Sequence, residues 1–382
     1  MLRLMTLTLV LSDVLGLTGL ACAADATATA NDPRRVATLI RQLGADKFQD
    51  REAASRALEA AGAEALEPLR QAANSTDLEV ARRAAEIIPI VERNVEIATL
   101  IQILAASPET QQRWNAADKL RRHGKHAAAA FPVLWKVAQN DQTIVADAAL
   151  RALGRVDPER AIPKLIELAK NPATSSDLFQ STALALAGIG TPAGEAVPAL
   201  IEALDRKQFG VRREAARALG YIGGDHPKLV PALLKALNDA DLEVRFSAVE
   251  ALGRLPQLPA DSIPALIEFL EKHQSLQLKS LSANRQKLLE LQHNDHISTA
   301  LQVLGRFGSD AKGAVPILID ILKDEKFSRG AHVDALTALE RIGPSANEAV
   351  PLLNDLAAGR MYGGNYAERA KLALRAILKP KP

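Results

Sequence analysis

Apolar residues recur at helical spacing in paired segments along most of the chain. In residues 196–223 a first stripe is followed by a polar turn and a second apolar stripe, and residues 229–255 repeat the order. The first stripe of the earlier copy is Val197, Leu200, Ile201 and Leu204, and the second stripe of the later copy is Val244, Ala248, Ala251 and Leu252. Because residues three and four apart share one face of a helix, each segment predicts two amphipathic helices joined by a turn.

The same unit recurs about ten times. Its first helix is marked by the residue one or two places before a Leu-Ile-like pair, at intervals of 30 to 35 residues apart from one interval of 52. These anchors are Thr38, Pro68, Thr99, Pro132, Pro163, Pro198, Pro231, Pro264, Pro316 and Pro351. One hairpin cannot bury both of its apolar faces, whereas stacked hairpins can, so the repetition predicts an α-solenoid.

Each unit carries its own start and stop signals. The anchor proline is expected in the first turn of the first helix, where its missing N–H costs nothing. Asp or Asn marks the turn, as at Asp239 and Asp241. Glycines at or just past helix ends are expected to cap them: Gly62, Gly124, Gly154, Gly190, Gly223, Gly308 and Gly343.

The segments "VPALIEAL" and "VRREAARALGYIG" resemble HEAT repeats, in particular the bacterial HEAT-like repeats of the phycobilisome-lyase type. The resemblance runs over about residues 34–379 and implies an all-α fold, an armadillo-like superhelix in a single domain. The extra residues of the eighth unit form an insertion at about 273–293. A HEAT scaffold by itself does not define a function.

The first residues differ from the rest. Arg3 precedes an apolar stretch from Leu4 to Leu20, which ends in Ala21-Cys22-Ala23. This pattern predicts a signal peptide over residues 1–23 and a short linker over 24–33, hence a periplasmic or secreted protein. Lipid attachment at Cys22, which would anchor the chain to the envelope, stays open.

Composition narrows the function classes. The chain has 382 residues, is 48% hydrophobic and 3% aromatic, and carries a net charge of +2. A protein dedicated to binding nucleic acid usually has a strong basic excess, so we expect no nucleic acid as a partner of this chain. The sole cysteine is Cys22, so no disulfide framework is predicted. No cofactor and no metal site are predicted, because the histidine pairs lack a third ligand.

Arginine occupies one position of several second helices: Arg51, Arg113, Arg212 and Arg245. Other units have Ala81, Ala146, Phe179, Ile297, His332 and Ala367 there. In HEAT repeats such an arginine commonly pairs with a turn aspartate of a neighbouring repeat. The resemblance therefore implies a structural ladder, incomplete in this chain.

A second column lies in the last turn of the second helices: Arg122, Arg155, Tyr221, Arg254, Arg306 and Arg341. Stacked repeats would line these residues along one edge. Two interpretations stand. A cation at a helix C-terminus is stabilised locally by about 0.3–1 kcal/mol, or the column is a binding stripe for a protein with an acidic segment or for an anionic polymer.

Two other segments are candidates for binding. The insertion contains Leu276, Leu278, Leu281, Leu288 and Leu291, which predict either a docking surface or self-packing. The segment "GRMYGGNYAER", residues 359–369, gathers Met361, Tyr362 and Tyr366. We expect it to cover the end of the stack, with partner binding as the alternative. Trp114 and Trp135 are expected to be core contacts.

The leading functional interpretation is a non-catalytic interaction scaffold or adaptor. It would hold another protein on the concave surface or the edge of the solenoid, with no catalytic residues. The alternative is an enzyme or an enzyme-accessory protein of the phycobilisome-lyase-like group. The resemblance to deoxyhypusine hydroxylases is limited to the fold, because no histidine here is followed by glutamate. The oligomeric state is not predicted.

Overall fold

The computed structural model describes residues 33–141, 143–274 and 296–379. These residues form helices joined by turns, with no strand among them. The predicted all-α solenoid of two-helix repeats is confirmed. Within the same residues, every helix is too short or too polar to cross a membrane.

The chain divides into two compact units, with the boundary between Gln112 and Arg113. The first unit contains α2 (Pro33–Gln42), α3 (Phe48–Ala61), α4 (Ala63–Ala72) and α5 (Leu78–Ala106). The expectation of one domain over residues 34–379 stays a prediction. The candidate site described below lies wholly in the second unit.

The first unit departs from the predicted hairpins in one place. The second helix of the second repeat and the first helix of the third form a single helix, α5, of 29 residues. The sequence offers no glycine between Leu78 and Ala106 to end the helix, and Pro89 is accommodated inside it. The prediction of a separate helix around the anchor Thr99 is therefore wrong.

The second unit alternates first and second helices. The first helices are α7 (Phe131–Asn140), α9 (Pro158–Lys170), α11 (Val197–Ala203), α13 (Leu229–Ala236), α15 (Ile263–Gln274), α17 (Val315–Lys323) and α19 (Val350–Ala357). The second helices are α6 (Thr110–His123, which begins at the unit boundary), α8 (Thr143–Val156), α10 (Ser176–Ile189), α12 (Phe209–Ile222), α14 (Leu242–Arg254), residues 296–306, α18 (Arg329–Ile342) and α20 (Ala367–Ile377).

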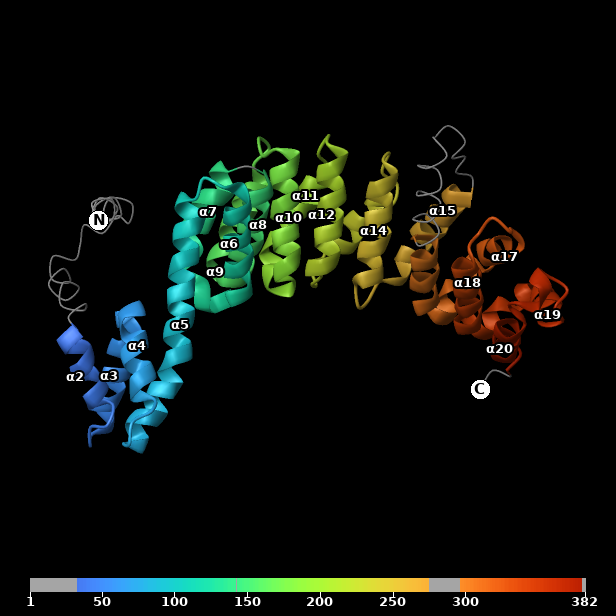
Figure 1. Cartoon of the computed structure of the whole chain (residues 1–382). Helices are drawn as coiled ribbons and strands as arrows, with labels where there is room; N and C mark the ends of the chain where they lie inside the picture. Colours follow the sequence, from blue (N-terminus) through green and yellow to red (C-terminus); the bar gives the residue numbers. More distant parts are fainter. Residues whose placement is uncertain (1–32, 142, 275–295, 380–382) are drawn as a thin grey trace. The chain divides into compact units, whose positions relative to one another are not determined.

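Short 3₁₀ helices precede several first helices. They are η1 (Gly124–Ala130), η2 (Thr191–Ala196), η3 (Ala260–Ser262), η5 (Gly308–Ala314) and η6 (Gly343–Ala349), while η7 (Tyr362–Gly364) lies in the last turn before α20. Consecutive second helices pack on each other, α8 on α10, α10 on α12 and α12 on α14. Figure 1 shows α10, α12 and α14 following one another in chain order.

The anchor prolines stand in the first turn of most first helices, as at Pro132, Pro198, Pro316 and Pro351. Pro68 and Pro163 are exceptions, because α4 and α9 begin five residues earlier and enclose them. In α9 the helix starts early because the Asp157 carboxylate accepts a hydrogen bond from the backbone N–H of Arg160.

Polar turns cap the following helices. Asp241 accepts hydrogen bonds from the backbone N–H groups of Glu243 and Val244, at 2.9 and 3.3 Å. Such caps contribute about 0.5–2 kcal/mol each. The predicted glycine caps have positive φ with one exception: Gly154 lies inside α8, where it faces Ile189 of α10 instead of capping.

Small residues set how closely the second helices approach. A Cβ atom on Gly220 of α12 would lie 2.5 Å from the Cα atom of Ala251 of α14, closer than any real contact. The alanines at the centre of these helices, such as Ala215, Ala216 and Ala248, are fully buried. The second helices can therefore pack closely, because the residues at their contacts have small side chains or none.

Some predictions fall outside the described residues. These are the signal peptide over residues 1–23 with Cys22, and the insertion leucines Leu276, Leu278, Leu281, Leu288 and Leu291.

Candidate functional site

The arginine ladder is built from side chains that tie each second helix to the turns around it. Arg212 makes a bidentate pair with Asp239 of the next turn, at 2.8 and 2.9 Å. Arg113 also donates to the aspartate of its next turn, through Nη1 to Oδ2 of Asp141. Burial opposes the charge of Asp239, but hydrogen bonds from Arg212 and from the backbone of Asp241 outweigh it and lower the pKa of Asp239.

The other two ladder arginines lack this aspartate. Arg245 donates to the carbonyl oxygens of Asp239 and Ala240 in its own turn. Arg51, in the first unit, donates to the carbonyls of Ala45 and Asp46 and lies 3.4 Å from Glu79. These arginines therefore satisfy the polar groups of the turns, which is a structural role.

Where the ladder lacks arginine, a different group fills its place. Phe179 is fully buried, and Arg206 of the next turn lies over its ring while donating to the carbonyl of Ala169. His332 is 2% exposed and contacts the carbonyl of Asp324. At Phe179 and His332, two of the six gaps seen in the sequence are thus filled by local substitutes.

The second-helix face of the second unit is formed by the residues one, five and nine places after the ladder position. In α6 these are Trp114, Asp118 and Arg122; in α8 they are Asp147, Arg151 and Arg155; in α10 they are Gln180, Leu184 and Gly188; in α12 they are Arg213, Arg217 and Tyr221. The predicted arginine stripe is the last of the three positions, so it forms one margin of this face.

Three arginines of the stripe are compensated by their neighbours. Arg122 pairs with Asp118 four residues earlier at 2.5 Å, and Arg254 pairs with Glu250 at 3.3 Å. Arg254 also lies over the ring of Tyr221 and donates to its hydroxyl. Arg306 donates to the carbonyls of Gly253, Leu255 and Pro256 at the end of α14. The local, structural interpretation fits these positions.

Arg155 and Arg341 are different. Both are exposed, and neither makes a hydrogen bond or an ion pair with any residue that the structure describes. The reason lies four residues earlier on the same helix, where Arg122 and Arg254 have an acid but Arg155 has Arg151 and Arg341 has Thr337. The guanidinium groups of Arg155 and Arg341 are therefore available to a ligand.

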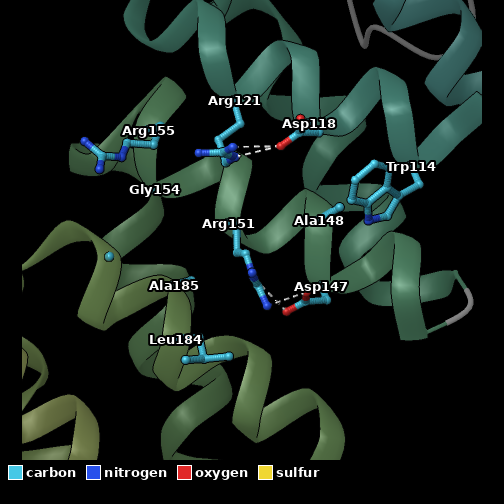
Figure 2. A pocket seen from close by; sticks show the side chains of 11 residues that line it. Trp114, Asp118, Arg121, Asp147, Ala148, Arg151, Gly154, Arg155, Leu184 and Ala185 are labelled. Atoms are coloured by element: carbon cyan, nitrogen blue, oxygen red, sulfur yellow. Dashed lines mark hydrogen bonds and ion pairs between the residues drawn. The ribbon is translucent and has the colours of Figure 1, made fainter.

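A cavity of about 340 Å³ opens on the face beside Arg155. Figure 2 shows the side chains that line it from α6, α8 and α10. Dashed lines join Arg121 to Asp118 and Arg151 to Asp147, both at 2.8 Å, whereas Arg155 has none. Three arginines thus face two carboxylates, which leaves an excess of positive charge.

The lining is also chemically mixed. Trp114 is half-buried at one side, and Leu184, Ala185 and Gly188 of α10 form a floor of small and apolar groups. The expectation that Trp114 is a core contact is wrong, because it lies on this open face. A hydrogen bond from Arg121 holds the pKa of Asp118 below its usual range, so this carboxylate is ionised at neutral pH. The cavity offers cations beside an apolar surface.

Two further cavities continue along the same face. One of about 410 Å³ is lined by Gln180 of α10, by α12, by α14 and by His296. Another of about 370 Å³ lies between α14 and residues 299–306. The predicted arginine stripe marks only one margin of this surface. The acids and arginines four and eight residues earlier on the same helices are the signal that could have located the rest.

The segment 359–369 packs on the end of the repeat stack. Tyr366 is 7% exposed, and its hydroxyl lies 3.1 Å from Nδ1 of His332. Tyr362 donates to the carbonyl of Leu322, and the three rings contact one another at 5.0–5.3 Å. Burial raises the pKa of both tyrosines. Their hydroxyl groups are engaged within the fold, which is the arrangement of a cap.

Metal binding finds no support in the described part of the chain, where no group of three or more His, Cys, Asp or Glu residues could hold an ion.

Known families match the repeats directly. A profile described as HEAT repeats matches residues 97–177 and 197–284, and the PBS lyase HEAT-like repeat matches residues 180–206. The predicted resemblance to HEAT repeats is confirmed over these residues.

No curated protein matches this chain. Solved structures do: an engineered protein at 22% identity and TM-score 0.47 covers 91% of this chain and 99% of its own. Human deoxyhypusine hydroxylase in complex with glycerol has 20% identity, coverages of 76% and 99%, and TM-score 0.32. The complex of CpcE and CpcF of phycocyanin lyase from Nostoc sp. PCC7120 has 20% identity, coverages of 74% and 94%, and TM-score 0.36. At these values none of the three carries a functional conclusion.

Proposed function

We propose that this HEAT-repeat chain is a non-catalytic interaction protein that holds an extended acidic segment of another protein on the second-helix face at α6, α8 and α10. The single observation that carries the proposal is the exposed guanidinium of Arg155 at the edge of a cavity in which arginines outnumber carboxylates. A rigid surface formed by stacked helices needs little ordering to bind, which favours such a role.

The chemistry of the cavity favours a polypeptide over a nucleic acid. Asp118 and Asp147 would repel successive phosphates, and the whole chain carries a net charge of only +2. An acidic side chain can reach Arg155 while an adjacent apolar side chain rests against Trp114 and Leu184. A segment that alternates acidic and apolar residues therefore fits both parts of the lining.

The test uses a fluorescein-labelled acidic peptide, Asp-Glu-Asp flanked by one Phe and one Leu, and measures its binding by fluorescence anisotropy. Arg155→Glu should weaken binding about tenfold, because a surface ion pair is worth roughly 0–1 kcal/mol and reversal replaces attraction by repulsion. The matched control is Arg341→Glu, an exposed arginine at the same repeat position in α18, outside the cavities of the face. Equal loss in both variants, or no binding at all, contradicts the proposal.

The location of the protein is part of the proposal. Export is supported by Arg3, by the apolar stretch Leu4–Leu20 and by the small residues around Cys22. Mass spectrometry of the protein from fractionated cells should find a chain that begins at Ala24, in the periplasm or the medium. A lipid on Cys22 would place it on the envelope instead, and an intact Met1 in the cytoplasm would contradict export.

An enzyme or enzyme-accessory role remains the alternative, favoured by the match of residues 180–206 to the PBS lyase HEAT-like repeat. It is tested by incubating the purified chain with a bilin and recording its visible absorbance after denaturation. A covalently retained or transferred chromophore would support this alternative against the scaffold.

A further inference from the structure

A buried carboxylate lies in the second cavity of the face. Glu214 of α12 is 2% exposed and lines the cavity of about 410 Å³. Its Oε1 atom accepts a hydrogen bond from Arg213 at 3.0 Å. Its Oε2 atom is buried and receives no hydrogen bond from any described residue, and Nη1 of Arg217 lies 3.9 Å from it. A buried carboxylate oxygen normally has a donor, so this atom points to a ligand.

The neighbours of Glu214 define the charge of that ligand. Arg213 is shared, because it also pairs with Glu243 at 2.6 Å. Glu250 lines the same cavity as well, but it already pairs with Arg254 at 3.3 Å and lies 3.5 Å from Nδ1 of His296. The cavity at α8 differs, because three arginines face two carboxylates there. A cationic group with N–H donors fits the acceptor that stays open in the second cavity, the Oε2 atom of Glu214.

The walls of the cavity favour a cation carried on an alkyl chain. The ring of His296 stacks on the buried ring of Phe246 with the centroids 3.9 Å apart, and both residues line the cavity beside the carboxylates. Arginine and lysine bury their methylene groups along apolar surfaces while the charged end makes polar contacts. Arginine suits the site best, because its planar guanidinium presents five donors.

We propose that the cavity between α12, α14 and residue 296 binds an arginine side chain of the same extended segment whose acidic group is held at α8. This inference rests on the proposed function. The two cavities adjoin on α10, where Gln180 lines one and Leu184, a single helical turn later, lines the other. The face of α10 between them is uncharged, so a segment can cross it without meeting a like charge.

The geometry gives the spacing of the two charges in the ligand. Neighbouring helices pack roughly 8–10 Å apart, so α8 and α12, separated by α10, are about two such steps apart. An extended chain advances roughly 3.3–3.6 Å per residue. The acidic residue and the arginine should therefore be about five or six residues apart in the bound segment.

The experiment uses three labelled peptides, each made in the forward and in the reversed sequence order. Each contains an Asp-Glu-Asp triplet and one test residue. The test residue is arginine six residues from the triplet, arginine two residues from it, or glutamine six residues from it. We expect the first to bind about tenfold more tightly than the other two. Glu214→Gln should abolish that gain, whereas Glu202→Gln, an exposed glutamate on α11 of the same repeat, should keep it.

A second variant tests the same cavity in case Glu214→Gln does not fold. Ser247→Lys places an ammonium group in the cavity from α14, where Ser247 lines it. It should remove the arginine-dependent gain, keep the binding of the glutamine peptide, and leave the helical circular dichroism unchanged. A gain that survives in both Glu214→Gln and Ser247→Lys overturns the proposed site.

The outcomes separate this inference from the function on which it rests. If all three peptides bind equally, the acidic site stands and the arginine site is overturned. If none binds, the proposed function fails, and a titration with N-acetyl-arginine amide followed by NMR decides the site by itself. Shifts confined to α12, α14 and His296, and lost in Glu214→Gln, would support it; no shifts there would overturn it.

Discussion

The second-helix face uses one repeat register in two different ways. In α8 the three face positions hold Asp147, Arg151 and Arg155, beside a cavity. In α18 they hold Val333, Thr337 and Arg341, and the buried His332 of the same helix ties the face to the terminal tyrosines. The repeat therefore prescribes the backbone and the core, while the face positions are free to carry charge in α8 and packing where the stack ends.

The helix contacts of the two regions differ as well, and this gives the largest expected effect. Gly220→Ala should destabilise the protein by about 3 kcal/mol, because its new Cβ atom would overlap the backbone of Ala251. Gly305→Ala, at the same register next to α18, should be nearly neutral, because its nearest neighbour is 3.4 Å away. Chemical denaturation measures both; equal losses would show that the two contacts are equally close.

The terminal cap should depend on a single hydroxyl group. Tyr366→Phe leaves Nδ1 of the buried His332 without its partner, which costs about 1–3 kcal/mol. Tyr221→Phe is the matched control on the face, where the hydroxyl only meets the exposed Arg254, and it should cost less than about 0.5 kcal/mol. Thermal unfolding compares the two variants, and a larger effect of Tyr221→Phe would reverse the assignment of roles.

The two regions should respond to opposite extremes of pH. Asp118 and Asp239 have a lowered pKa in the folded chain, so the stability they contribute is present above their ordinary value of 3.8 and is lost as the pH falls below it. Tyr362 and Tyr366 have a raised pKa, so their contribution is present below 10.0 and is lost as the pH rises beyond it.

Denaturation curves at pH 7, 3 and 11 measure this, with Asp118→Asn and Tyr366→Phe as reference variants. Asp118→Asn should lose less stability than the wild type between pH 7 and 3. Tyr366→Phe should lose less between pH 7 and 11. If a variant loses as much stability as the wild type over the same pH range, the substituted residue does not cause the pH dependence.

The smallest expected effect concerns the two unpaired arginines. Arg155→Ala and Arg341→Ala should each change stability by about 0.3–1 kcal/mol, since both cations lie in the last turn of a helix. Their equal effect on stability, measured by urea denaturation, would sharpen the contrast with their unequal effect on peptide binding. A much larger loss for Arg155→Ala would indicate that it is a structural residue.

The repeats could be predicted because they obey local rules, and the ladder pairs could be predicted for Arg113 and Arg212 but not for Arg51 and Arg245. Anchor prolines, turn aspartates and closing glycines each fix a short stretch of backbone, and Arg212 reaches the next turn from a fixed position. The continuous α5 was not predicted. The two helices expected in its place have no glycine between them that would end the first one. Trp114 was assigned to the core because burial of an aromatic residue is the usual outcome, and only packing shows which side of α6 is left open.

The cavities could not be predicted from the stripe alone. Whether an arginine is free depends on the residue four places earlier and, for Arg306, on the carbonyl oxygens at the end of α14. The role of Glu214 depends on α14 and His296, which lie more than 25 residues away in the sequence. Such a site becomes visible only when consecutive second helices are placed side by side.

The most direct test of the account locates the bound peptide. An acidic peptide with a benzophenone group next to its Asp-Glu-Asp triplet is photo-cross-linked to the purified chain, and the attachment site is found by mass spectrometry. The account predicts attachment on α6, α8 or α10, around Trp114, Arg155 and Leu184. Attachment on the first helices α7 and α9, or on α18 and α20, would contradict it.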